Sequence, residues 1–157
     1  MDLEKYTHLA FFCGLSTADI QLLVPLFAPQ TWVAGTVVFE QGDCAEYLYL
    51  VVSGEVTIRY KPDDGPVMNL TRVQPGGIFG WSAAMGNPTY TSGALCTLDS
   101  EVLCIRGADL RMICGKHPEL GKVILERLSA IIAERQRGQQ SQVNSMLKTG
   151  MRQQSNN

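Results

Sequence analysis

The chain has 157 residues, 45% of them apolar, which fits one folded domain with a substantial core and excludes a disordered chain. The net charge at pH 7 is −2, and the part before position 135 holds nine basic and 15 acidic residues, so it offers no basic patch for nucleic acid. No apolar run approaches the roughly 20 residues of a membrane span.

The first predicted element is helical and lies within residues 3–28. Ser16 and Thr17 are suited to cap a helix whose apolar face contains Ile20 and Leu23. Because proline lacks an amide hydrogen and clashes with the preceding turn, Pro25 should end or bend this helix near Leu23.

A period of two replaces the helical pattern after Thr31. It predicts short strands, rich in Val, Ile, Tyr and Phe and separated by glycine-containing turns, at residues 36–40, 46–52, 55–61, 67–73, 92–98 and 101–106. In the third strand, Val56, Ile58 and Tyr60 should be buried and the residues between them should face water. Closely spaced short strands of this kind indicate a barrel or sandwich.

The helical period returns after the strands. A short helix is predicted over residues 107–115, and a longer one begins with Pro118 near its first turn and fades at Gly138. The polar, Gln-rich residues 138–157 are expected to form a disordered tail.

The longer helix carries an apolar stripe that packs either on the barrel or against a second copy of the chain. Its residues are Leu120, Ile124, Leu128 and Ile131. Because Leu125 and Ile132 lie on an adjoining face, the helix is suited to do both. We therefore expect a homodimer that uses this helix.

Four stretches, in this order of elements, resemble a known family. They are Val37–Asp43, Tyr47–Val56, Pro75–Gly80 and Thr97–Ile105. They resemble the cyclic nucleotide-binding domain of the catabolite-activator and fumarate–nitrate-regulator superfamily. The resemblance implies a mainly β fold with flanking helices, namely a β jelly-roll barrel with an N-terminal helix and a long C-terminal helix, in a domain of residues 1–137.

The resemblance also implies that cyclic AMP or cyclic GMP binds between the barrel and residues 76–94, here called the 76–94 segment. In the family, a Gly-Glu pair and an arginine followed by a small residue hold the ribose and the cyclic phosphate. On a gapless alignment from Gly80, Trp81 takes the glutamate position, Thr91 takes the arginine position and Ser92 the small one. A charged hydrogen bond contributes about 1.5–3 kcal/mol. Losing the arginine should therefore weaken nucleotide binding by about 10- to 100-fold.

The run Gly-Trp-Ser-Ala followed by Tyr-Thr is more similar to the gas- and redox-sensing members of this superfamily. Those proteins carry a DNA-binding helix-turn-helix domain after the long helix. About 20 polar residues follow Arg137, too few for such a domain. We therefore expect a stand-alone sensor-type domain that does not bind DNA by itself.

The candidate ligand pocket consists of Gly80, Trp81, Ser82, Ala83, Tyr90, Thr91 and Ser92. One interpretation is that it takes a neutral or weakly polar small molecule. In another, Trp81 fills it, and the domain acts in protein interaction or dimerisation. A third interpretation is weak binding of a cyclic nucleotide. The hydroxyls of Ser82, Thr91 and Ser92 and the backbone N–H groups near Ala83 could donate hydrogen bonds to its phosphate.

The cysteines are Cys13, Cys44, Cys96, Cys104 and Cys114. An odd number without a Cys-x-x-Cys pair indicates reduced thiols. Cys96 and Cys104 lie symmetrically about Ser100, so in a hairpin centred there their Cβ atoms would be about 4.5–5.5 Å apart, close to disulfide geometry. A redox switch and two small buried hydrophobes are both consistent with this spacing.

Catalysis finds little support in the sequence. His8 and His117 are the only histidines, and neither lies on a predicted strand, so the metal cluster of a cupin-type enzyme is missing. His8 and Cys13 could together hold a haem, as in a haem sensor. In the other interpretation, the two residues simply lie on an exposed helix surface. We expect a regulatory ligand-sensing module, not an enzyme. Because acids occupy the N-terminus where a signal peptide needs basic residues, we expect it in the cytoplasm, away from membranes.

Overall fold

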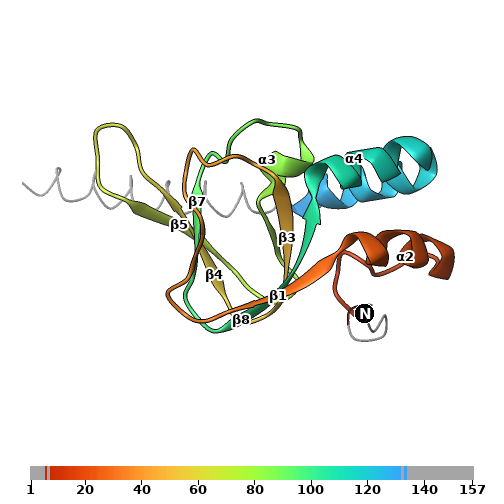
Figure 1. The fold of residues 1–157 in the computed structure, drawn as a ribbon, viewed down its shortest axis with the longest axis horizontal. Coiled ribbons are helices and arrows are strands. Elements are labelled where there is room, and N and C mark those ends of the chain that lie inside the picture. The colour runs from red at the N-terminus through yellow and green to blue at the C-terminus, as the bar shows by residue number, and fades with distance from the viewer. Residues whose placement is uncertain (1–5, 7, 132, 134–157) are drawn as a thin grey trace, which may run out of the picture.

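The computed structural model describes residues 6, 8–131 and 133, and its strands form two four-stranded antiparallel sheets (Figure 1). The first sheet has the order β1-β8-β3-β6, with β1 Ala28–Trp32, β8 Ser100–Arg106, β3 Tyr47–Ser53 and β6 Ile78–Phe79. The second has the order β2-β7-β4-β5, with β2 Val37–Phe39, β7 Gly93–Cys96, β4 Val56–Tyr60 and β5 Met68–Val73. This architecture confirms the predicted mainly β jelly-roll fold.

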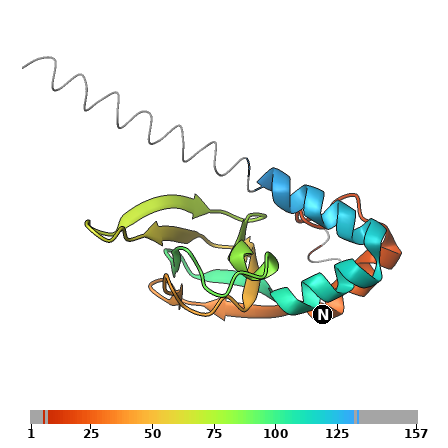
Figure 2. The same cartoon turned by 90° about the horizontal axis from the view of Figure 1, so that it is seen from above.

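Helices gather at one end of the two sheets (Figure 2). They are α2 Thr17–Leu23, followed by a 3-10 turn Val24–Leu26, then α4 Gly107–Lys116 and a helix over residues 118–131. A four-residue helix, α3 Trp81–Ala84, lies between β6 and β7. None of the helices that the structure describes is long and apolar enough to cross a membrane.

The N-terminal helix begins and ends for the predicted reasons but is shorter than predicted. The Ser16 hydroxyl accepts a hydrogen bond from the Asp19 amide at 3.1 Å, and Pro25 lies in the 3-10 turn that ends α2. The prediction of helix up to residue 28 is wrong at that end, because β1 begins at Ala28. The side chains of β1 are mostly exposed, with no alternation of buried and exposed residues. The strand is defined by its antiparallel pairing with β8.

The predicted strands are found to within two residues of their ends, but two details differ. Thr57 is buried, and its hydroxyl donates a hydrogen bond to the Thr97 hydroxyl at 3.4 Å. Tyr60, expected in the core, is 39% exposed at the end of β4. The strand β6 was not predicted, because two residues are too few to show an alternating pattern of apolar and polar side chains.

The predicted hairpin centred on Ser100 is wrong. β7 pairs with β2 and β4, whereas β8 pairs with β1 and β3 in the other sheet. The chain crosses between the sheets at residues 97–99. Cys96 and Cys104 therefore do not face one another across a ladder, and both are buried free thiols whose pKa burial raises. The geometry on which the redox switch depended is absent.

The first sheet is covered on both faces. On β3, Tyr49 and Val51 point between the two sheets, while Leu48 and Leu50 pack against the helices. Its central strands β3 and β8 are therefore buried along most of their length, as expected of strands between two hydrophobic layers.

The apolar stripe of the C-terminal helix packs on the helical layer of the domain itself. Leu120, Ile124 and Leu128 are 3%, 1% and 7% exposed, and Ile131 packs against the same cluster. Of the two alternatives for this stripe, packing within one copy is the one that the structure shows. Leu125, on the adjoining face, is 62% exposed. Ile132 and the predicted tail 138–157 lie outside the described residues.

Candidate functional site

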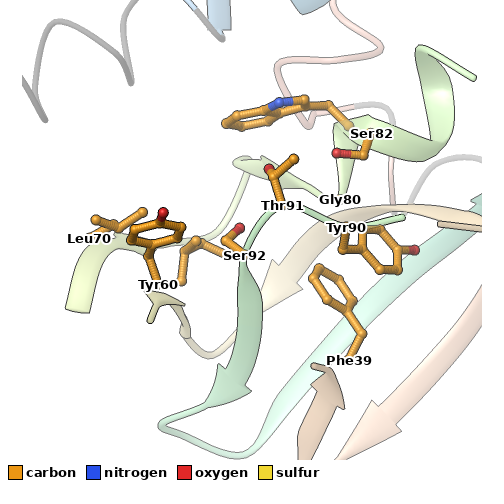
Figure 3. Close-up of a pocket in the computed structure, with 10 residues that line it drawn as sticks. Phe39, Tyr60, Leu70, Gly80, Ser82, Tyr90, Thr91 and Ser92 are labelled. Carbon is orange, nitrogen blue, oxygen red and sulfur yellow. The ribbon is translucent and has the colours of Figure 1, made fainter. Parts of the chain in front are cut away.

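A pocket of about 240 Å³ lies between the second sheet and the 76–94 segment (Figure 3). It is lined by Gly80, Trp81, Ser82, Tyr90, Thr91 and Ser92 from the segment, and by Phe39, Ile58, Tyr60 and Leu70 from the strands. Six of the seven residues that the sequence nominated are thus brought together. Ala83 does not line the pocket, because its side chain points from α3 into the core and is only 1% exposed.

A glycine makes the turn that presents α3 to the pocket. Gly80 has φ of +78°, the left-handed region, and a Cβ there would lie 2.9 Å from the Tyr47 carbonyl oxygen. Only glycine adopts this conformation without strain. The turn places Trp81 and Ser82 at the start of α3, next to the barrel.

Tyr90 forms the base of the pocket and is held from several sides. Its hydroxyl donates a hydrogen bond to the Tyr47 carbonyl at 2.6 Å and accepts one from the Tyr47 amide at 3.1 Å. Its ring stacks on Phe39, with centroids 3.6 Å apart and an angle of 11°. The Tyr90 backbone bonds to Gly42 and Asp43 at 2.9 Å each. This fixes the chain that carries Thr91 and Ser92.

The pocket is electrically neutral. None of its ten lining residues carries a formal charge. Burial raises the pKa of the Tyr90 phenol, and burial together with Tyr90 raises that of the adjacent Tyr49, so both stay protonated at neutral pH. Anion recognition in proteins usually depends on a fixed cation, which this lining lacks.

Two cations next to the lining residues Ile58 and Tyr60 lie on the other face of the sheet. Arg59 and Lys61 alternate along the chain with Ile58 and Tyr60, and they line a second hollow of about 450 Å³ together with Glu40. Because successive side chains of a strand point to opposite faces, these two cations point away from the pocket.

The 76–94 segment is joined to the C-terminal helices at the end of α3. The Arg111 guanidinium of α4 donates a hydrogen bond to the Ala83 carbonyl. A Cβ on Gly107, the first residue of α4, would overlap that same carbonyl. The pocket-lining helix α3 is therefore in direct contact with α4.

Sequence reasoning missed Arg111 and the four lining residues on the strands. The alternation of Val56, Ile58 and Tyr60 was enough to place Ile58 and Tyr60 on one face, but not to show what that face meets. Arg111 left no signal, because only the tertiary fold brings α4 to α3.

Side chains of the kinds that can hold a metal ion occur across the described residues. The part of the chain that the structure describes contains no group of three or more His, Cys, Asp or Glu side chains suited to hold a metal ion. His8 is exposed, and the Cys13 thiol donates to its carbonyl oxygen at 3.7 Å.

Comparison with known proteins gives matches across the barrel. Residues 29–117, which include every residue lining the pocket, match the model of the family described as cyclic nucleotide-binding domain. The "Cyclic AMP receptor protein" of Thermus thermophilus is 27% identical over 126 residues, 80% of this chain and 56% of the relative. The chain therefore spans little more than half of that relative's length.

Solved structures agree with this match. A protein from Geobacter metallireducens, described as a cyclic nucleotide-binding protein, is 27% identical, with a TM-score of 0.76 over 86% of this chain and 98% of that one. A cyclic nucleotide-binding domain from Methylobacillus flagellatus is 19% identical, with a TM-score of 0.80 over 92% and 81% of the two chains. The second likeness concerns the fold alone.

Proposed function

The chain belongs to the cyclic nucleotide-binding domain family, and from this premise we propose that it is a regulatory ligand-sensing module. Its ligand would occupy the pocket between the second sheet and the 76–94 segment. The observation that carries this proposal is the pocket itself, in which six nominated residues meet four strand residues. The proposed activity is binding, not catalysis.

We propose that the module does not bind cyclic AMP or cyclic GMP in the way usual for the family. Trp81 and Thr91 stand where the resemblance places the glutamate and the arginine, and the lining is uncharged. A cyclic phosphate there would find hydroxyl and backbone N–H groups only. At about 1.4 kcal/mol per factor of ten, the lost charged contact corresponds to binding weaker by about 10- to 100-fold.

The proposed signal leaves the pocket through α3 and α4. Ligand contacts at Trp81 and Ser82 would shift α3, and the contacts of Ala83 with Gly107 and Arg111 would pass that shift to α4. A ligand changes this equilibrium only if it binds one arrangement of the helices more tightly than the other.

We also propose that the module pairs with a second copy through the outer face of the helix 118–131. Leu125 is 62% exposed there, beside a groove of about 610 Å³ that Cys114, Pro118 and Gly121 help to line. The inward stripe is already used, so a dimer would depend on this outer face.

A second candidate function is protein interaction by a domain whose pocket is filled. Its support is the pocket volume of about 240 Å³, which lies below the roughly 300–1,000 Å³ usual for small-molecule sites. In this alternative, Trp81 takes the space that a ligand would need.

Native mass spectrometry of the purified full chain, combined with hydrogen exchange, separates the two candidates. A sensor should carry a co-purified small molecule, and removing it should change amide exchange in α3 and across residues 107–131. A chain that carries no added mass, and whose exchange is unchanged after unfolding and refolding, would instead favour the filled pocket.

A further inference from the structure

We infer that the pocket is built for an uncharged, ring-containing small molecule with a hydrogen-bonding group such as an amide or a hydroxyl. This inference rests on the proposed function only in taking the pocket to be a ligand site. It names the class of ligand from the charge, the hydrogen-bonding groups and the rings of the lining.

The charge of the lining disfavours ions of either sign. The ten lining residues are neutral, and Arg59 of β4 and Lys61, the residue after it, line the other hollow instead. Taking an ion out of water without a partner costs several kcal/mol or more, whereas a neutral group that finds a hydrogen bond loses little. No acidic side chain lines the pocket to balance a cation either.

The hydroxyl of Ser82 supplies the second observation. Ser82 is only 5% exposed, and no hydrogen bond of its hydroxyl is found among the described residues. Every described side-chain oxygen or nitrogen that is fully shut off from solvent does have a partner, so the Ser82 hydroxyl keeps some exposure, and Ser82 lines the pocket. A buried polar group in this position is satisfied by a ligand or a water.

Thr91 and Ser92 add two hydroxyls to the same space. In Figure 3 both lie between Tyr60 and Leu70 on one side and Ser82 on the other. Three neutral groups that each donate and accept suit a neutral polar substituent.

Aromatic side chains define the shape of the remaining space. Trp81 and Tyr60 line the pocket, and the stacked pair of Phe39 and Tyr90 lines it from the barrel side. Aromatic rings favour offset-stacked or edge contacts with another ring. With a volume of about 240 Å³, the pocket suits a ligand of about one ring with a short substituent.

Three molecules of nearly equal shape test the assignment: benzamide is neutral, benzoate is an anion and benzamidine is a cation. Each is titrated into the ¹⁵N-labelled full chain while the indole N–H signals of Trp81 and Trp32 are followed by NMR. Trp32 does not line this pocket, so it is an internal reference. We expect benzamide to shift Trp81, and the amides of Ser82 and Ser92, with a Kd at least ten-fold lower than those of benzoate and benzamidine.

Single substitutions test whether benzamide binding depends on the Ser82 hydroxyl. Ser82→Ala should weaken benzamide binding about 2- to 10-fold, the equivalent of one neutral hydrogen bond. Ser53→Ala, which changes an exposed serine at the end of β3 that does not line this pocket, should leave the Kd unchanged. Equal or tighter binding of benzoate or benzamidine, or no shift of Trp81 with benzamide, would overturn the inference.

The outcomes for ligand class and for sensing are separate. If benzamide binds but amide exchange across residues 107–131 does not change, the ligand class stands and the sensor proposal fails. If cyclic AMP binds more tightly than benzamide and changes that exchange, the sensor proposal stands and the inference of a neutral ligand fails.

Discussion

Tyr90 decides the shape of the pocket base, because one side chain holds both the strand β3 and the ring of Phe39. Its hydroxyl accepts a hydrogen bond from the Tyr47 amide and donates one to the Tyr47 carbonyl on β3. Removing the hydroxyl while keeping the ring separates the hydrogen bonds from the stacking.

Tyr90→Phe should lower the free energy of unfolding by about 1–3 kcal/mol, because it leaves buried backbone groups without a partner. Urea denaturation measures this loss. Tyr60→Phe changes a tyrosine that is 39% exposed and should cost less than about 0.5 kcal/mol. Equal effects of the two substitutions would show that the Tyr90 hydrogen bonds do not matter.

At this scale the sequence predicted the site well where residues are adjacent in the chain. Gly80 to Ser82 and Tyr90 to Ser92 all reach the pocket. Ala83 was misplaced because the helical turn of α3 points it into the core instead. The neutrality of the pocket was visible from composition, whereas the unpaired state of Ser82 needed coordinates.

At the scale of elements, a direct contact between α3 and α4 joins the pocket-lining segment to the C-terminal helices. It depends on a glycine, because Gly107 leaves no space for a Cβ against the Ala83 carbonyl. The same helix offers an internal control, since a Cβ on Gly115 would meet nothing within 4 Å.

Gly107→Ala should destabilise the domain by about 1–3 kcal/mol, because the added methyl group must push α3 and α4 apart. Gly115→Ala should stabilise it by up to about 0.5–1 kcal/mol, since alanine is the better helix former. Thermal unfolding followed by circular dichroism compares the two. If both variants were stabilised, the two helices would not be in the contact described.

The elements that the sequence misjudged share one physical cause. The pairing of strands depends on contacts between distant segments, so local periods could not show that β7 and β8 lie in different sheets. The edge strand β1 is mostly exposed and carries no alternation. The stripe of the last helix was recognised, but its partner, the helical core cluster, is assembled only in the fold.

For the whole molecule, the proposed dimer would cover the outer face of the helix 118–131. We expect the full chain to sediment as a dimer at micromolar concentration and Leu125→Asp to sediment as a monomer, because a charge at this position would be buried in the interface. Analytical ultracentrifugation measures both.

Met68→Asp is the control for this experiment, because it places the same charge on an exposed apolar residue of β5, in the second sheet. It should leave the dimer intact. A native chain that sediments only as a monomer would contradict pairing through this face.

The central claim is that the 76–94 segment keeps the shape of a nucleotide site and has lost its charges. Isothermal titration of cyclic AMP into the native chain and into the double variant Trp81→Glu/Thr91→Arg tests it most directly. We predict binding at least about ten-fold tighter in the double variant, as expected for a restored charged hydrogen bond. Binding by the native chain as tight as that of the variant, or tighter, would contradict the account.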